Sequence, residues 1–190
     1  MKDRCRMTVP QHLLCLFGLI LLAGVSPAKS AEPPPTVPYV DLERYRGTWH
    51  ELARLPAWFQ RDCLQSQAVY EPLAPGRLSV VNSCPTADGK TKVARGSATV
   101  VDPVGNARLE VVFDNWFSRL FPWLVKGDYW ILYLDPEYRT VIVGTPDRKY
   151  LWIMAREPSI PEENYRALVE RATDLGFATD RLLRVAPPPD

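Results

Sequence analysis

The sequence predicts an all-β domain in which eight antiparallel strands are followed by one C-terminal α-helix. Two observations favour this fold class. Segments with alternating apolar residues, rich in β-branched and aromatic side chains, recur along the chain. The connections between them are too short for the helical crossover that parallel strands require. The chain has 190 residues, which is enough for one domain or at most two small ones.

Eight segments read as strands, and turn residues separate them. In chain order they span residues 48–55, 66–73, 77–83, 92–101, 107–114, 129–134, 139–145 and 150–156. Ala74-Pro75-Gly76 and Pro146-Asp147-Arg148-Lys149 are typical hairpin connections. Eight antiparallel strands of this length form either a sandwich or a closed up-and-down barrel.

One helix follows the last strand. Ser159 and Glu162 have the spacing of a capping box, and Gly176 is a natural stop. The apolar residues between them fall on one helical stripe, which predicts that the helix packs on the outside of the sheet; they are Tyr165, Leu168, Val169, Ala172 and Leu175. Residues 181–185 are predicted to add a last short strand.

The N-terminal residues are predicted to be an export signal. Lys2, Arg4 and Arg6 precede the apolar run Leu13–Val25, which is shorter than the roughly 20 residues of a membrane span. We expect a signal peptide over residues 1–30, with cleavage near Ser30, and a periplasmic or secreted protein. Association with the outer membrane is the alternative.

Proline-rich segments flank the predicted domain. Residues 31–38 are expected to form an extended leader outside the core, residues 39–186 the domain, and residues 187–190 a tail. The formal net charge of +1 argues against a nucleic-acid partner, because phosphate binding needs a basic surplus on one face.

Two cysteines remain after the predicted cleavage. Cys63 and Cys84 are expected to form a disulfide in an oxidising compartment, worth about 3 kcal/mol in the chain-entropy model, and two free buried thiols are the alternative. The sequence has only two histidines, His12 and His50, which argues against a zinc site built on several imidazoles. We predict no cofactor and no metal.

Three separated pieces of the sequence meet at one end if the strands form an up-and-down barrel. Gly47 and Trp49 open the first strand, Asp135 and Tyr138 lie in the turn after the sixth, and Arg156 ends the eighth. The first strand starts at the end of the barrel where even-numbered strands finish. We therefore expect the Arg156 guanidinium to stack on the Trp49 ring and close that end.

This constellation resembles the lipocalin family. The segment Tyr45–Pro56 (YRGTWHELARLP) is similar to the opening of the bacterial outer-membrane lipocalins, the plant temperature-induced lipocalins and apolipoprotein D. Residues 127–132 (GDYWIL) and 150–156 (YLWIMAR) match the same subgroup, and the likeness covers about 39–186. It implies an eight-stranded up-and-down β-barrel that binds lipid, with the helix packed outside. Val25 departs from the subgroup, because many bacterial members carry a lipid-attachment cysteine there.

The barrel interior is the predicted ligand site. Strand alternation and the closing Arg156 assign the inward residues, although both faces of the sixth strand are apolar. The predicted ligand-binding set is Tyr70, Leu109, Val111, Phe113, Tyr129, Ile131, Tyr133, Trp152 and Met154. We expect fatty acids or lysophospholipids as ligands of a carrier that is a monomer or weak homodimer. A core filled by its own side chains is the alternative.

The connection 115–124 is predicted to lie at the open end. It is unusually apolar, and it forms either the lip of the pocket, with transient contact to a membrane surface, or a cap on the core. The lip residues are Trp116, Phe117, Phe121 and Trp123.

The sequence offers little for catalysis. A serine–histidine–aspartate triad needs a histidine, and His50 alternates outward from Trp49. Glu51 shares the Trp49 face and is expected to hydrogen-bond Arg156 or a tyrosine. We therefore predict a binding protein; the alternatives are a lipocalin-fold enzyme acting on a lipid, or a carrier of another hydrophobic molecule such as a porphyrin or retinoid.

Overall fold

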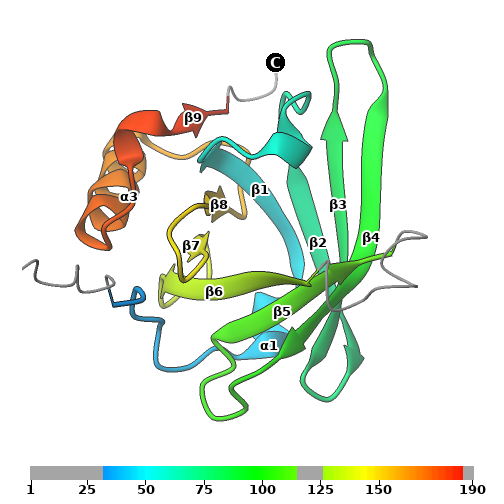
Figure 1. The fold of residues 1–190 in the computed structure, drawn as a ribbon, viewed down its shortest axis with the longest axis vertical. Helices are drawn as coiled ribbons and strands as arrows, with labels where there is room; N and C mark the ends of the chain where they lie inside the picture. The colour runs from blue at the N-terminus through cyan, green and yellow to red at the C-terminus, as the bar shows by residue number, and fades with distance from the viewer. Residues whose placement is uncertain (1–31, 115–125, 186–190) are drawn as a thin grey trace, which may run out of the picture. The chain divides into compact units, whose positions relative to one another are not determined.

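Nine antiparallel strands form one sheet in the order β2-β3-β4-β5-β6-β7-β8-β1-β9, and an additional pairing of β1 with β2 closes the first eight into a barrel (Figure 1). The structure is a computed structural model that describes residues 32–114 and 126–185. The predicted eight-stranded up-and-down barrel is confirmed, as is the C-terminal helix beside it.

The elements follow the order expected from the sequence, with three short additions. The strands are β1 (Gly47–Arg54), β2 (Gln67–Ala74), β3 (Arg77–Pro85), β4 (Thr91–Val100), β5 (Arg108–Phe113), β6 (Lys126–Leu134), β7 (Thr140–Gly144), β8 (Leu151–Ala155) and β9 (Leu183–Arg184). The helices are α1 (Leu42–Tyr45), η1 (Trp58–Gln60), α3 (Glu162–Asp174) and η3 (Thr179–Arg181). The additions that were not predicted are α1, η1 and η3. None of the helices in the described ranges is long and apolar enough to cross a membrane.

Strand β1 changes partners along its length. Residues Gly47–His50 pair with β2, and farther along the same edge Ala53 and Arg54 pair with β9. Strand β1 therefore separates from β2 as it approaches η1, and β9 covers the edge that β2 leaves (Figure 1). Covering this edge prevents an unpaired row of backbone groups.

The sheet separates two apolar clusters. The inner cluster lies on the inner face of the barrel and includes Trp49, Leu109 and Ile131. The outer cluster lies between the sheet and α3, and it joins Ile142 and Ile153 of the sheet to Leu168 of the helix. The predicted apolar stripe of the helix therefore docks where it was expected.

Strand β6 contains a register shift between Ile131 and Tyr133. A β-bulge inserts one extra residue, so the alternation of faces is offset beyond it. Leu132 and Tyr133 both join the outer cluster, whereas Leu134 packs against the inner one. The prediction that Tyr133 faces the interior is therefore wrong, and Arg171 of α3 lies 4.3 Å from the centre of its ring instead.

The proline-rich leader does not lie outside the core. Pro34 is fully buried, and Val37 packs against the inner cluster while its N–H donates to the Ile131 carbonyl at 2.9 Å. Helix α1 follows this leader. Asp41 caps the helix, because its side chain accepts hydrogen bonds from the Glu43 and Arg44 N–H groups.

The start and end of the C-terminal region also differ from expectation. Helix α3 has Pro161 at its N-cap and no side-chain capping bond, so the capping box predicted at Ser159 does not form. The helix ends as predicted before Gly176, whose φ of +84° is the left-handed conformation that suits glycine. The predicted strand over 181–185 is reduced to the two residues of β9.

Candidate ligand-binding site

Arg156 closes one end of the barrel. Its guanidinium carbon lies 3.9 Å from the centre of the buried Trp49 ring, as the sequence predicts. Its N–H groups also donate to four backbone oxygens at 2.8–3.2 Å; these belong to Arg44, Tyr45, Thr48 and Tyr138. The guanidinium therefore joins α1, β1 and the turn between β6 and β7. Burial is the main influence on the pKa of Arg156 and lowers it.

The other predicted closing residues support this plug. The Asp135 carboxylate accepts from the backbone N–H groups of Glu137 and Arg139 and from Thr140, which fixes the turn. Tyr138, at φ 59°, aims its carbonyl at Arg156. Gly47 has φ +91°, and a Cβ there would lie 3.5 Å from Arg156 Nη1. A side chain at this position would be strained, which explains the glycine.

Three tyrosine hydroxyls meet inside the barrel above the plug. The Tyr129 hydroxyl lies 2.6 Å from that of Tyr45 and accepts from that of Tyr70 at 3.0 Å. Tyr45 comes from α1, Tyr70 from β2 and Tyr129 from β6. We call these residues the tyrosine triad. Tyr45 was not predicted, because it precedes the first strand and belongs to a helix that the sequence pattern did not indicate.

The triad holds one hydroxyl proton more than its internal hydrogen bonds use. Three hydroxyls carry three protons and are joined by two bonds, so one O–H has no acceptor among the described residues. Burial raises the pKa of Tyr70 to about 12 and raises the pKa values of Tyr45 and Tyr129 well above the usual range. The hydroxyls therefore stay protonated at neutral pH and act as donors.

The structure brings eight of the nine predicted lining residues to the inner face. Six belong to the inner cluster, namely Tyr70, Leu109, Val111, Tyr129, Ile131 and Met154. Phe113 and Trp152 pack against it and are only partly buried. The exception is Tyr133, which the bulge in β6 turns outward. The lining is therefore buried at the end of Tyr70 and Tyr129 and partly exposed at the end of Phe113 and Trp152.

A buried polar network lies on the inner face near the opposite end. The Glu51 carboxylate accepts from Arg54 Nη1 at 2.5 Å and from Gln60 Nε2 at 2.9 Å. Gln60 also accepts from the Trp152 indole N–H at 2.9 Å and donates to Ser66. Both charged side chains are almost fully buried, at 3% exposure for Glu51 and 6% for Arg54. The expectation that Glu51 bonds Arg156 or a tyrosine is wrong.

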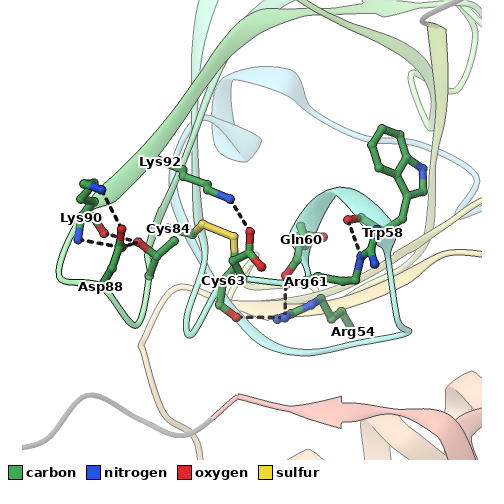
Figure 2. A network of polar contacts seen from close by, with 11 residues as sticks. Arg54, Trp58, Gln60, Arg61, Cys63, Cys84, Asp88, Lys90 and Lys92 are labelled. Carbon is green, nitrogen blue, oxygen red and sulfur yellow. Dashed lines mark hydrogen bonds and ion pairs between the residues drawn. A yellow bond between two sulfur atoms is a disulfide. The ribbon is translucent and has the colours of Figure 1, made fainter.

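The network ties the η1 loop to the barrel wall. Arg54 Nη2 donates to the Gln60 and Cys63 carbonyls, and Cys63 forms the predicted disulfide with Cys84 of β3 (Figure 2). Arg54 Nε is buried without a partner among the described residues, and the same holds for Asn82 Oδ1. Sequence alternation missed Arg54, because a register shift between Glu51 and Ala53 turns it inward.

Several predictions fall outside the described residues. The lip residues Trp116, Phe117, Phe121 and Trp123 lie there, as does the predicted export signal over residues 1–30. His50 is described, and it faces outward as expected: it pairs with Ala155, a member of the outer cluster.

A closed eight-stranded barrel with an arginine–tryptophan plug and an apolar, aromatic interior defines a class of proteins that bind hydrophobic molecules. Residues 40–187 match the family described as lipocalin-like domain. The chain is 38% identical over 146 residues to temperature-induced lipocalin-1 of Arabidopsis thaliana, covering 75% of this chain and 77% of the relative. It is 34% identical over 182 residues to the outer membrane lipoprotein Blc of Escherichia coli, covering 93% and 98%.

A solved structure agrees in fold. Lobster apocrustacyanin A1 superposes with a TM-score of 0.62 over 85% of this chain and 94% of its own, at 11% identity. The chain therefore belongs to the lipocalin family, as its sequence motifs indicate. Members of this family are generally binding or carrier proteins.

Proposed function

We propose that this chain binds a single-chain acyl lipid, a fatty acid or a lysophospholipid, inside the barrel and carries or stores it in support of membrane maintenance. The observation that carries the proposal is an apolar inner face that ends at hydroxyl donors. The relatives support a hydrophobic ligand, because they are lipocalins, and the name of one of them links it to the outer membrane.

The lining suits an acyl chain. Trp152, Phe113 and Met154 offer aromatic and thioether surface without a formal charge. Each methylene that moves from water to such a surface contributes about 0.8 kcal/mol. We propose that the ligand enters at the end where Trp152 and Phe113 lie, opposite the plug at Arg156; the partial exposure of these two rings supports this.

The tyrosine triad suits the polar end of a ligand that enters head first. Its spare proton, on Tyr129 or Tyr45, donates to a carboxylate or a phosphate oxygen. This hydrogen bond offsets part of the cost of removing the carboxylate or phosphate group from water. We infer that the triad selects for a hydrogen-bond acceptor at the leading end of the ligand.

The proposed setting is outside the cytoplasm, either the periplasm or the secreted fraction, with the outer membrane as the alternative site. We propose that the protein works as a monomer or weak homodimer, with transient contact to membranes. The carrier function is favoured over an enzyme on lipids because both oxygens of Glu51, the buried carboxylate of the interior, are engaged by Arg54 and Gln60.

Native mass spectrometry of protein purified without detergent tests the proposal first. We expect a co-purified mass that dissociates on extraction and is identified as an acyl lipid. Titration with a fatty acid should then change the fluorescence of Trp152, and subtracting the same titration of Trp152→Phe isolates that signal. An empty protein with no response of Trp152 would refute an acyl ligand.

The role of the triad is tested by Tyr45→Phe/Tyr70→Phe/Tyr129→Phe, because Tyr129→Phe alone would leave the Tyr45 and Tyr70 hydroxyls free to donate. We expect the affinity for a fatty acid to fall about tenfold, because a hydrogen bond to a charged group is lost. Tyr165→Phe is the control, since Tyr165 of α3 packs outside the barrel, against the cluster between the sheet and the helix. Equal affinities of the two variants for a fatty acid would place the polar end of the ligand elsewhere.

A further inference from the structure

A basic cleft of about 340 Å³ lies at the turn between β7 and β8. Arg148, Lys149 and Arg181 line it, together with Tyr150 and the apolar surface of Leu55 and Pro56. The turn between β7 and β8 lies at the end opposite the Arg156 plug, because β8 runs from this turn to Arg156. The cleft therefore belongs to the same end of the molecule as the entrance.

Arg148 is held in place at this cleft. Its Nε donates to the Leu175 carbonyl at 2.8 Å, and a Cβ on Gly176 would lie 3.0 Å from the same nitrogen. The glycine thus leaves room for the arginine. With Nε engaged, the remaining guanidinium N–H groups of Arg148 have no partner among the described residues and can bind an anion; their planar arrangement matches phosphate oxygens.

The cleft keeps positive charge after its local ion pair is counted. Lys149 pairs with Asp147 at 2.8 Å, whereas Arg148 and Arg181 have no carboxylate partner among the residues that the structure describes. The lining residues themselves include three cations and no acid. This charge favours an anionic occupant.

Exposed aromatic rings continue from the cleft. The Tyr150 ring lies 5.6 Å from that of Phe59, and the Phe59 ring lies 5.7 Å from that of Trp58. Trp58 is 71% exposed and Phe59 47% exposed. Large aromatic rings beside cations are typical of surfaces that contact the interfacial region of a bilayer. A site for free phosphate would not need them.

We infer that this surface, the basic cleft with Trp58 and Phe59, docks the entrance of the barrel on a bilayer by binding the phosphate of an anionic phospholipid headgroup. The inference deepens the membrane part of the proposed function and does not depend on which ligand the interior holds. It uses residues different from the lip predicted at 115–124.

Vesicle co-sedimentation of the full chain tests the inference. The variant Lys149→Glu/Arg181→Glu is compared with Arg77→Glu/Arg139→Glu, which makes the same change of charge in turns at the closed end. The four substituted side chains are all exposed. Every protein carries the same N-terminal residues, so a difference in vesicle binding reports the substituted positions. Thermal melts confirm that both variants fold.

On vesicles of phosphatidylglycerol in phosphatidylcholine, we expect the cleft variant to bind at least about tenfold more weakly, and the control variant to change by less than about twofold. Salt should weaken the wild-type binding, because the surface is within reach of ionic screening. The variant Trp58→Ser/Phe59→Ser should bind more weakly even on pure phosphatidylcholine.

Equal losses in the cleft and control variants would reduce the effect to net charge and overturn the inference, as would unchanged binding of the cleft variant. Cleft-dependent binding of inorganic phosphate without vesicle binding would also overturn it. The fatty-acid titration followed at Trp152 separates the two proposals. The cleft variant should keep its affinity for the fatty acid, and a failed titration with intact vesicle binding would refute only the interior ligand.

Discussion

The Glu51–Arg54 pair makes the sharpest prediction about stability. The variant Glu51→Gln keeps the shape of the side chain but removes its charge, which leaves the Arg54 guanidinium buried without an anion. Both side chains are below 7% exposure, so water cannot replace the lost partner. Breaking such a pair costs about 3–5 kcal/mol. That loss is a large part of the 5–15 kcal/mol that is typical of a whole domain.

Urea unfolding followed by circular dichroism, with the disulfide intact, measures this loss. Glu43→Gln is a matched control, because Glu43 and Arg46 have the same i,i+3 spacing but are 69% and 56% exposed. An exposed pair is worth about 0–1 kcal/mol, so the control should change little. The two variants differ in burial and share the chemistry of the substitution.

A second comparison separates the lost charge from lost contacts. Replacing both partners, as Glu51→Leu/Arg54→Met, removes the orphan charge, and such replacements are often neutral. The double variant still loses the Arg54 bonds to two carbonyls, at about 1 kcal/mol each. We expect it to be more stable than Glu51→Gln. A single variant within about 1 kcal/mol of the wild type, or a double variant less stable than the single, would refute the reasoning.

Three further predictions follow from the contacts described above. Arg156→Lys keeps the charge, but one ammonium group cannot reach the four carbonyls that the guanidinium binds. We therefore expect the free energy of unfolding in urea to fall by about 2–4 kcal/mol. A fall of less than about 1 kcal/mol would contradict the structural role of the Arg156 guanidinium. Replacing Cys63 and Cys84 together by alanine opens a loop of 21 residues and should cost about 3 kcal/mol, measured against the oxidised wild type. Burial raises the pKa of Asp147, but bonds from Lys149 and Thr145 outweigh it and lower the pKa from 3.8 to about 2. Because the folded-state pKa is depressed, the contribution of Asp147 to stability is present above about pH 4 and is lost toward pH 2. Asp147→Asn should flatten the pH dependence of the melting temperature between these two pH values. An unchanged slope would contradict this contribution of Asp147.

The fold and the closed end were predictable because they depend on local signals and strand direction. Alternation located the strands of the barrel to within a few residues, and the direction of strands brought Trp49, Asp135 and Arg156 together without any distance information. The disulfide followed from the number of cysteines left after the predicted cleavage. The meeting of Trp49, Asp135 and Arg156 needs only that neighbouring strands are antiparallel and joined in order.

The leader and the polar network were not predictable for physical reasons. Pro34 and Val37 lie in a proline-rich stretch whose composition is typical of an exposed linker, and only the tertiary contact with Ile131 buries them. Arg54 at the end of a strand reads as a solvated residue. Its burial depends on the η1 loop, whose Gln60 and Cys63 carbonyls accept its protons.

Register shifts in β1 and β6 account for the orientations of Arg54 and Tyr133, which alternation did not predict, and they link the interior to the helix. Each bulge points two consecutive residues outward, Leu52 and Ala53 in β1 and Leu132 and Tyr133 in β6, and all four enter the cluster beneath α3. In a strand with strict alternation, only one of two consecutive residues would face the helix. The bulges therefore widen the apolar surface available to the helix. The same offset turns Arg54 inward, so the docking of α3 and the polar network beside Trp152 share one structural cause.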